Sequence, residues 1–124
     1  MEAQRRALAP YSRFKVGAAL LTRKGEVIMG ANVESASYGL SCCAERVALF
    51  KALTNGLKDF VAIAVVAPAK GTVMPCGACR QLLAEYAPKA KVWTADSRSP
   101  GKVKEFSVAE LLPSAFLDVF QKRV

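Results

Sequence analysis

The sequence predicts an α/β protein: a single domain over residues 1–124, folded as a three-layer α/β/α sandwich around a five-stranded mixed sheet. Segments with the apolar pattern of strands alternate with segments of helical spacing, which is typical of a sheet covered by helices. The chain has 124 residues and is 52% hydrophobic, enough to fill one core of ordinary size. Residues 60–67 form a nearly unbroken run rich in Val and Ile, as expected of a central strand buried on both faces.

The first third of the chain predicts a short helix followed by a hairpin. The helix runs to Leu8 and ends before Pro10, whose ring disfavours helical geometry in the preceding residue. Compact apolar residues at 14–21 and 27–32 flank a turn at 23–26 with the sequence Arg-Lys-Gly-Glu. This arrangement predicts two antiparallel strands.

A loop and a longer helix are expected next. Residues 31–41 are small and polar without periodicity, which is typical of a loop that carries function. Residues 43–53 are rich in helix formers, and Asn55-Gly56 provides a C-terminal stop. We expect one face of this helix to carry three larger apolar side chains, Val47, Phe50 and Leu53.

The second half of the chain alternates in the same way. After the strand at 60–67 the expected elements are a loop, a helix and two short strands, at residues 68–75, 76–86, 91–95 and 103–106. Pro88 stops the helix. Ser107 and Glu110 have the spacing of a capping box, which predicts a final small helix.

The charge and the hydropathy pattern exclude some classes of partner. The formal net charge is +8, with 18 Lys and Arg against 10 Asp and Glu. Clustered cations would indicate nucleic acid, but here they are scattered through loops and the C-terminal tail, so we interpret them as a solvated surface and expect no nucleic-acid partner. No apolar run reaches the roughly 18 residues that a bilayer requires, and residues 1–10 hold no apolar signal core. We therefore expect a cytoplasmic protein without a membrane partner.

The chain has four cysteines and no histidine. Cys76 and Cys79 stand three residues apart at the start of a predicted helix, so both sulfurs can reach one ion. A C-x-x-C pair can also be a redox pair, half of a structural zinc site or two core cysteines, and its late position disfavours the redox interpretation. A structural site needs four ligands, and the neighbours Cys42 and Cys43 rarely both reach one tetrahedral ion.

Cys43 offers a third ligand and Glu45 an acid beside it. Three thiolates leave one position on zinc open for a water that becomes hydroxide near neutral pH. Glu45 can sit beside that water only if Cys43 lies at the helix cap or in the first turn, where geometry is looser. Because three thiolates give the site a net negative charge, we expect a nearby cation, with Arg46 favoured over Arg80.

These residues also have simpler interpretations. Glu45 could merely complement the helix dipole, and Arg46 could be a solvated surface arginine. Asn32 and Glu34 could be polar residues at a strand end, and Phe116 could be buried in the core of its own chain. The adjoining C-x-x-C favours the chemical interpretation for Glu45 and Arg46.

Two motifs resemble those of the zinc-dependent cytidine deaminases of the homotetrameric type: Cys43-Ala44-Glu45-Arg46 and Pro75-Cys76-Gly77-Ala78-Cys79-Arg80-Gln81. The similarity covers nearly the whole chain, including Pro10-Tyr11-Ser12, Asn32-Val33-Glu34 and Leu111-Leu112-Pro113-Ser114. The resemblance implies the cytidine deaminase-like form of the α/β fold and a homotetramer. It also implies one Zn²⁺ per chain, held by Cys43, Cys76 and Cys79.

The resemblance further implies a substrate site for a nucleoside. Asn32 and Glu34 are implied to hydrogen bond the ribose hydroxyl, Phe14 to pack against the nucleoside, and Ala44 to belong to the same site. Two aromatic residues are implied to complete the site of a neighbouring subunit, namely Tyr38 and Phe116.

The implied activity is hydrolytic deamination of cytidine and deoxycytidine to uridine and deoxyuridine plus ammonia, a step of pyrimidine salvage. The enzyme would be a hydrolase acting on a carbon–nitrogen bond of a cyclic amidine. Zinc-bound hydroxide would attack C4 of cytosine while Glu45 protonates N3 and then the leaving amine. The alternatives are a deaminase of another cytosine nucleoside, such as an aminonucleoside antibiotic, a deaminase of polynucleotides, and a structural zinc-binding nucleic-acid module. Phe14 with the 32–34 pattern favours the plain nucleosides.

Two features depart from the family pattern. The helix before Pro10 is short, which bears on its packing and on the stability of an oligomer. Cys42 is an additional thiol at a place that the family does not use for metal, so we expect it to be no ligand while Cys43 is intact.

Overall fold

The computed structural model describes residues 1–69 and 73–115. Its elements are, in order, η1 (Ala3–Arg6), β1 (Gly17–Thr22), β2 (Val27–Ala31), η2 (Tyr38–Leu40), α1 (Ala44–Thr54), β3 (Phe60–Ala67), α2 (Gly77–Tyr86), β4 (Lys91–Asp96), β5 (Lys104–Ser107) and α3 (Val108–Leu111). Every helix and strand expected from the sequence is present, and most boundaries differ by one to three residues.

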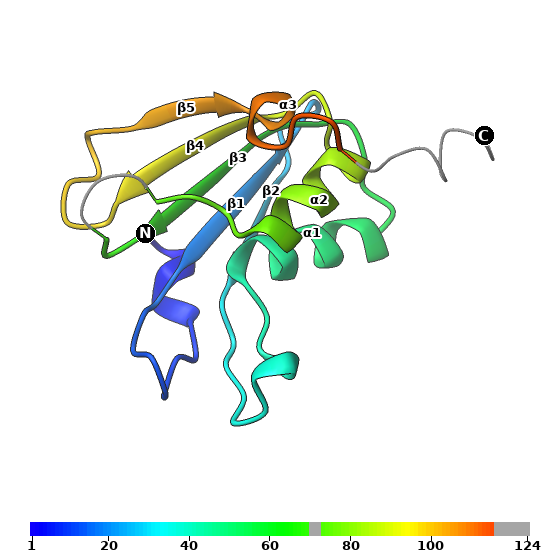
Figure 1. The fold of residues 1–124 in the computed structure, drawn as a ribbon. Helices are drawn as coiled ribbons and strands as arrows, with labels where there is room; N and C mark the ends of the chain where they lie inside the picture. Colours follow the sequence, from blue (N-terminus) through cyan, green and yellow to red (C-terminus); the bar gives the residue numbers. More distant parts are fainter. Residues whose placement is uncertain (70–72, 116–124) are drawn as a thin grey trace.

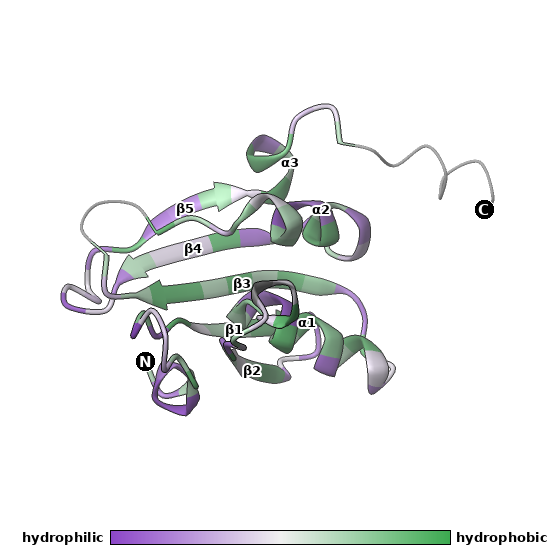
Figure 2. Ribbon diagram, turned by 60° about the horizontal axis from the view of Figure 1, so that its bottom comes forward, coloured by the Kyte–Doolittle hydropathy of each residue, from purple (hydrophilic) through white to green (hydrophobic). Residues whose placement is uncertain are grey.

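The five strands form one mixed sheet in the order β2-β1-β3-β4-β5. β3 and β4 run parallel, while the other neighbouring pairs run antiparallel. β3 lies in the middle and is coloured as mostly apolar in Figure 2, in keeping with the buried central strand that its sequence predicts. The predicted fold class is confirmed.

Two glycines show how closely the helical elements approach the sheet. Gly30 pairs with Ala18 and Gly17 pairs with Ala31, so the two glycines lie at adjacent positions of one ladder and face opposite sides. A Cβ added to Gly30 would come within 2.5 Å of the Ala48 nitrogen in α1, and one added to Gly17 would collide with Gln4 in η1. The sheet therefore has α1 against one face and the short η1 against the other.

The first face carries the main core and both long helices. α1 and α2 lie side by side over it, with their N-terminal ends at the same end of the sheet (Figure 1). Leu83 of α2 and Val65 of β3 are almost completely buried in this layer. The two helix starts are therefore brought together although β3 separates them in the sequence.

The buried face of α1 differs from the expected one. Val47 and Leu53 are only partly buried, and Phe50 is 42% exposed. The buried residues are instead mainly small: Ala44, Glu45, Ala48, Leu49 and Ala52. The alanines among them lie where α1 approaches the sheet closely over Gly30, so the buried face of α1 is not the one that carries Val47, Phe50 and Leu53.

The two ends of the described chain are short helical segments. η1 is a 3-10 turn, shorter than the helix expected up to Leu8. At α3 the predicted capping box is present: the Glu110 amide donates to Ser107 Oγ at 3.1 Å, and the Ser107 amide donates to Glu110 Oε1 at 2.6 Å. Within residues 1–69 and 73–115, no helix combines the length and the apolar character needed to cross a bilayer.

Candidate metal centre and its pocket

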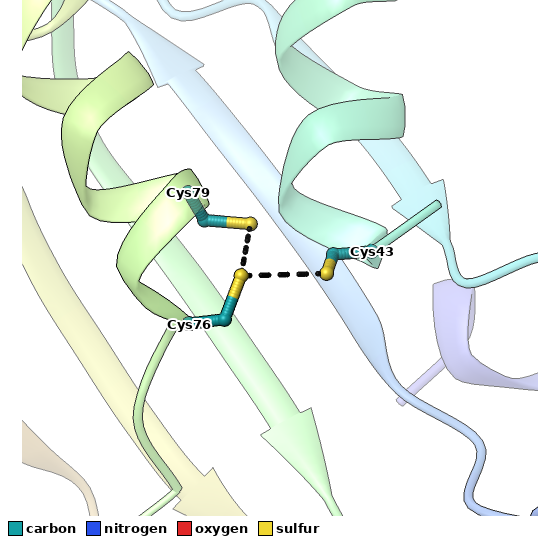
Figure 3. Close-up of side chains that lie close together, drawn as sticks. All are labelled: Cys43, Cys76 and Cys79. Atoms are coloured by element: carbon teal, nitrogen blue, oxygen red, sulfur yellow. Dashed lines mark hydrogen bonds between the residues drawn. The ribbon is translucent and has the colours of Figure 1, made fainter. Parts of the chain in front are cut away.

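Three cysteine sulfurs gather where α1 and α2 begin. Cys43 is the N-cap of α1, Cys76 is the N-cap of α2, and Cys79 lies in the first turn of α2. Cys76 Sγ lies 3.6 Å from Cys43 Sγ and 3.3 Å from Cys79 Sγ, and Figure 3 shows the three sulfurs pointing toward one another. Neither cap side chain accepts a capping hydrogen bond from a backbone N–H of its own helix, and both sulfurs are directed into the cluster.

The cluster fits a zinc ion with three protein ligands. A tetrahedral ion with Zn–S bonds of about 2.3 Å holds its sulfurs about 3.8 Å apart, close to the separations seen here. Within the described part of the chain, the group that could hold a metal comprises these three cysteines, whose sulfurs lie within 4.8 Å of one another. No acid of the described residues joins them as a fourth ligand, and the sequence has no histidine. Three ligands leave a coordination position for water or substrate.

The surroundings of the sulfurs favour a thiolate. The pKa of the Cys43 thiol is lowered to about 5, chiefly because the Cys79 thiol donates a hydrogen bond to it, and the Arg46 guanidinium adds to the effect. The pKa of Cys79 is raised in turn because that hydrogen bond holds its proton. Both helix N-termini also direct their positive dipole ends toward the cluster. The site is thus suited to a cation bound through sulfur.

Glu45 lies beside the cluster in the first turn of α1 and is only 5% exposed. Its pKa is raised because burial disfavours the charged carboxylate, and the negative charge of Cys43 adds to the shift. Because Cys43 occupies the cap, as its spacing from Glu45 required, the carboxyl approaches the cluster without being part of the ligand group. A buried carboxyl with a raised pKa beside the cluster is suited to taking up and releasing a proton.

Arg46 and Arg80 play different parts in the structure. Arg46 Nη2 donates to the Ser41 carbonyl at 3.3 Å and to Cys43 Sγ at 3.5 Å. Arg80 instead donates from Nε to the Pro75 carbonyl at 2.8 Å and from Nη1 to the Leu111 carbonyl at 3.2 Å. Arg46 is therefore the cation at the sulfurs, while Arg80 ties the loop before α2 to α3.

A pocket of about 390 Å³ opens in front of the cluster. That volume lies within the range of about 300–1,000 Å³ typical of small-molecule sites. Its lining includes Cys43, Cys76 and Glu45 together with four predicted substrate residues, Phe14, Asn32, Glu34 and Ala44. Residues from separate segments of the chain thus surround a single cavity.

Asn32 and Glu34 also hold the pocket wall in place. Asn32 Oδ1 accepts the Val16 amide at 2.9 Å, and its Nδ2 donates to the Phe14 carbonyl at 2.8 Å. Glu34 Oε1 accepts the amides of Tyr11 and Ser12, both at 3.0 Å, and Ser12 Oγ donates to Glu34 Oε2. The bonds from Ser12 hold the pKa of the Glu34 carboxyl below its usual range. The sequence alone did not predict this positioning role for Asn32 or for Glu34.

Other lining residues carry no signal in the sequence. Val73 and Met74, from the loop before α2, line the pocket, as does Ser41, whose carbonyl orients Arg46. These are common residues in unstructured segments, and only the fold brings them to the site. Cys42 also lines the pocket, but its sulfur is outside the three-sulfur group, and burial raises the pKa of its thiol.

Two predicted residues fall on parts of the chain whose side chains the structure does not describe. Tyr38 lies in η2, and its side chain is outside the described part of the structure. Phe116 lies outside the described residues altogether. Their contacts with a neighbouring subunit therefore stay predictions.

A thiolate-bound zinc with an open position, next to a buried carboxyl that can exchange a proton, is the arrangement of zinc enzymes that activate water. The fold and the site place the protein in this class. Residues 1–95 match the model of a family described as "Cytidine and deoxycytidylate deaminase zinc-binding region". The chain belongs to the cytidine deaminase family.

Individual relatives agree with this assignment. A cytidine deaminase of Halalkalibacterium halodurans is 56% identical over 117 residues, which cover 94% of this chain and 87% of the relative. The crystal structure of cytidine deaminase from Burkholderia pseudomallei matches with a TM-score of 0.88 at 51% identity, covering 93% of this chain and 91% of that chain. A blasticidin-S deaminase of Bacillus cereus is 34% identical over 82% of this chain and 76% of its own length.

Proposed function

We propose that the protein deaminates cytidine and deoxycytidine by hydrolysis, giving uridine and deoxyuridine with release of ammonia. The observation that carries this proposal is the buried Glu45 carboxyl beside three converging sulfurs at the floor of a pocket of about 390 Å³. The names of the relatives with 56% and 51% identity support the same activity.

The metal of the proposed site is one Zn²⁺ per chain, held by Cys43, Cys76 and Cys79. When bound, zinc supplies a water of lowered pKa as the nucleophile for C4 of the cytosine ring. Arg46, 3.5 Å from Cys43 Sγ, offsets part of the negative charge of three thiolates.

Glu45 is the proton carrier of the proposed reaction. Its buried carboxyl first gives a proton to N3 of the ring as the nucleophile adds to C4, and this addition removes the aromatic stabilisation of the base. The carboxylate then takes the proton of the hydroxyl added at C4 and passes it to the amino group, so that the C–N bond breaks and the group leaves as ammonia. The raised pKa suits this role, because an ordinary carboxyl would lose its proton too readily to donate it at neutral pH.

The remaining pocket residues bind the nucleoside in this proposal. Phe14 packs against it, and Asn32 and Glu34 hydrogen bond the ribose hydroxyl. Both keep capacity for this bond, since an ionised carboxylate offers about four acceptor sites and an amide has two N–H donors. Ala44 also lines the pocket, and the group it offers the nucleoside is its backbone N–H, which the first turn of a helix leaves without an intrahelical partner.

We further propose a homotetramer in which Tyr38 and Phe116 enter the pocket of a neighbouring subunit. The pocket opens at the surface of the single chain, and the nearby residues Leu8, Tyr11 and Leu40 expose large apolar side chains that a second subunit could cover. Action on free nucleosides places the enzyme in pyrimidine salvage in the cytoplasm.

The test uses purified, zinc-replete protein with cytidine, deoxycytidine and blasticidin S, following the loss of cytosine absorbance. We expect conversion of both nucleosides and one zinc per chain. Glu45→Gln should retain the zinc while turnover falls by about 10²-fold or more, because it removes the proton carrier. Glu26→Gln, in the turn between β1 and β2, is the matched control and should leave turnover unchanged.

The outcomes separate the competing functions. No conversion of either nucleoside by zinc-replete protein would refute the enzyme proposal. Faster conversion of blasticidin S than of cytidine would replace it by a deaminase of antibiotic nucleosides. Full activity of Glu45→Gln would remove Glu45 from the mechanism.

A further inference from the structure

A second hollow, of about 350 Å³, lies outside the substrate pocket between η1 and the segment leading into β1. It is lined by Gln4, Arg5, Arg13, Lys15 and Pro68, which we call the basic hollow. Three of its five residues are cations and none is an acid. The fold thus brings three of the cations that are scattered in the sequence to one place.

The cations of the basic hollow are free to bind an anion. Within the described residues, the side chains of Arg5, Arg13 and Lys15 form no ion pair and no side-chain hydrogen bond. Two acids of the adjoining segments are engaged with other cations. Glu2 Oε1 lies 4.0 Å from Arg6 Nη2, and Asp96 Oδ1 lies 3.1 Å from Arg98 Nε.

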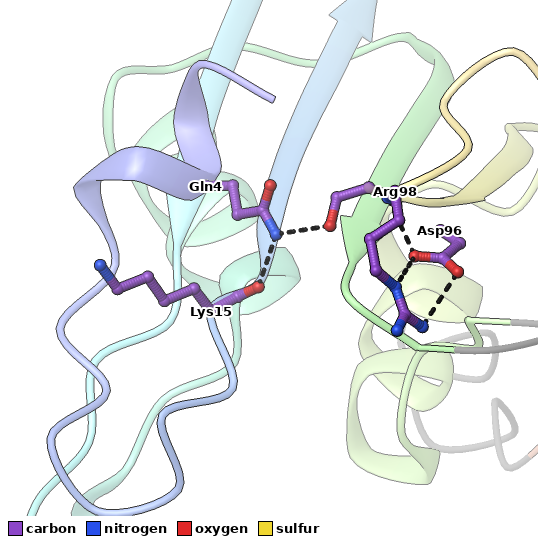
Figure 4. Close-up of polar contacts among 5 residues, drawn as sticks. Gln4, Lys15, Asp96 and Arg98 are labelled. Carbon is purple, nitrogen blue, oxygen red and sulfur yellow. Dashed lines mark hydrogen bonds and ion pairs between the residues drawn. The ribbon is translucent and has the colours of Figure 1, made fainter.

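The structure around the basic hollow is built from distant parts of the chain. Gln4 Nε2 donates to the Lys15 carbonyl at 3.0 Å and to Ser97 Oγ at 3.1 Å, which ties η1 both to the approach to β1 and to the end of β4. Figure 4 shows this link and the Asp96–Arg98 pair, with the Lys15 side chain extending away from that pair. The Lys15 ammonium is therefore not neutralised by Asp96.

Arg13 has an unusual backbone for an arginine. Its φ is 57°, in the left-handed region that residues other than glycine rarely adopt, and its amide donates to the Ala9 carbonyl at 2.9 Å. The next residues alternate in direction: Phe14 lines the substrate pocket, while Arg13 and Lys15 line the basic hollow. The strained turn thus places cations behind the wall of the substrate pocket.

We propose that the basic hollow binds the polyphosphate group of a small molecule. Two guanidinium groups match the oxygen geometry of phosphate, and Lys15 adds a third charge. Among the described residues, no aromatic side chain lines the hollow to stack on a base, so the ligand is recognised by its phosphates and not by its nucleobase. This proposal concerns binding alone and does not depend on the reaction at the zinc site.

Calorimetric titration of the zinc-loaded protein with inorganic pyrophosphate tests the proposal. We expect one site per chain whose affinity falls with added salt. The double variant Arg5→Gln/Arg13→Gln should bind at least about tenfold more weakly, because two charge-assisted contacts are lost. The control Arg23→Gln/Lys24→Gln removes the same charge at the distant β1–β2 turn and should bind within about twofold of wild type. Thermal unfolding checks that both variants fold, and Lys15→Gln provides a single-charge variant should the double variant unfold.

Three results would overturn the proposal. One is the absence of pyrophosphate binding at low salt, and a second is an equal loss in both double variants, which would indicate attraction by net charge alone. The third comes from titrating cytidine triphosphate and a single-stranded oligonucleotide beside pyrophosphate. Similar affinity for the triphosphate and pyrophosphate supports the proposal, whereas much tighter binding of the oligonucleotide would replace it by a nucleic-acid surface.

Discussion

Cys43 and Cys76 occupy helix N-caps without making the hydrogen bond that a cap side chain ordinarily gives. Serine or aspartate at these positions would stabilise the helix starts, whereas sulfur is a weak acceptor. The two residues are directed instead at each other and at Cys79. At these positions the sequence favours a metal site over the stability of the metal-free fold.

Because Cys76 is directed at the metal site instead of capping α2, Cys76→Ser should have opposite effects on zinc content and on the stability of the metal-free fold. Zinc content, measured by mass spectrometry of metals, should fall well below one per chain. The free energy of unfolding in urea with a chelator present should stay equal or rise by about 0.5 kcal/mol, because serine caps α2. Cys42→Ser is the control and should keep the zinc, since its sulfur lies outside the cluster. Full zinc in Cys76→Ser would contradict the assignment of this ligand.

Thr94 offers a second test at the scale of one residue. It is 1% exposed, and its hydroxyl has no hydrogen-bond partner among the described residues. Thr94→Val should therefore raise the free energy of unfolding by about 1 kcal/mol, because a buried hydroxyl without a partner is destabilising. Thr54→Val is the control. The Thr54 hydroxyl donates to the Phe50 carbonyl at 2.7 Å, so its removal should not raise the free energy of unfolding. A loss of stability in Thr94→Val would show that its hydroxyl has a partner.

Among the elements, some follow from the sequence and others do not. β3 could be predicted to the residue because eight apolar, mostly β-branched or small residues suit only a strand buried on both faces. The buried side of α1 could not, because Leu49 and the alanines are buried there while Val47 and Phe50 are not. Ala48 and Ala52 face the core since Gly30 lets the helix backbone approach, and that contact joins elements distant in the chain.

The close approach of α1 to β2 leads to a prediction for Gly30→Ala. The added methyl would lie 2.5 Å from the Ala48 nitrogen, in backbone that has no flexible end to move aside. We expect the free energy of unfolding to fall by about 2 kcal/mol and zinc to bind more weakly, because α1 also carries Cys43. Gly39→Ala, where nothing lies within 4 Å of the added carbon, should leave both nearly unchanged. An unaltered stability of Gly30→Ala would contradict the packing of α1 described above.

Across the whole molecule, the site depends on how distant segments are brought together. The motifs of Cys43 and Cys76 indicated the ligands, yet their meeting requires α1 and α2 to begin at the same end of the sheet. The gathering of Arg5, Arg13 and Lys15 is likewise a product of the fold, and their spacing in sequence suggested only a dispersed charge. The spacing of residues in the sequence predicts which side chains of one helix can share a ligand. It does not predict which loops line the cavity.

The assembly is the prediction that belongs to this scale. Sedimentation equilibrium should give a tetramer, and Phe116→Ala should raise the KM for cytidine by about tenfold with the tetramer intact, because each pocket loses an aromatic contact from its neighbour. Phe106→Ala, which removes a partly buried phenylalanine that packs on the core, is a control for a general loss of stability. A fully active monomer would rule out the shared pocket.

The double engagement of Asn32 and Glu34 constrains how this enzyme could be retargeted. The side chains proposed to bind the sugar also hold the backbone of residues 11–16 in place. A substitution that alters sugar preference there would at the same time loosen an entire wall of the cavity. New specificities are thus more readily reached through Val73 and Met74, whose side chains line the cavity without anchoring that wall.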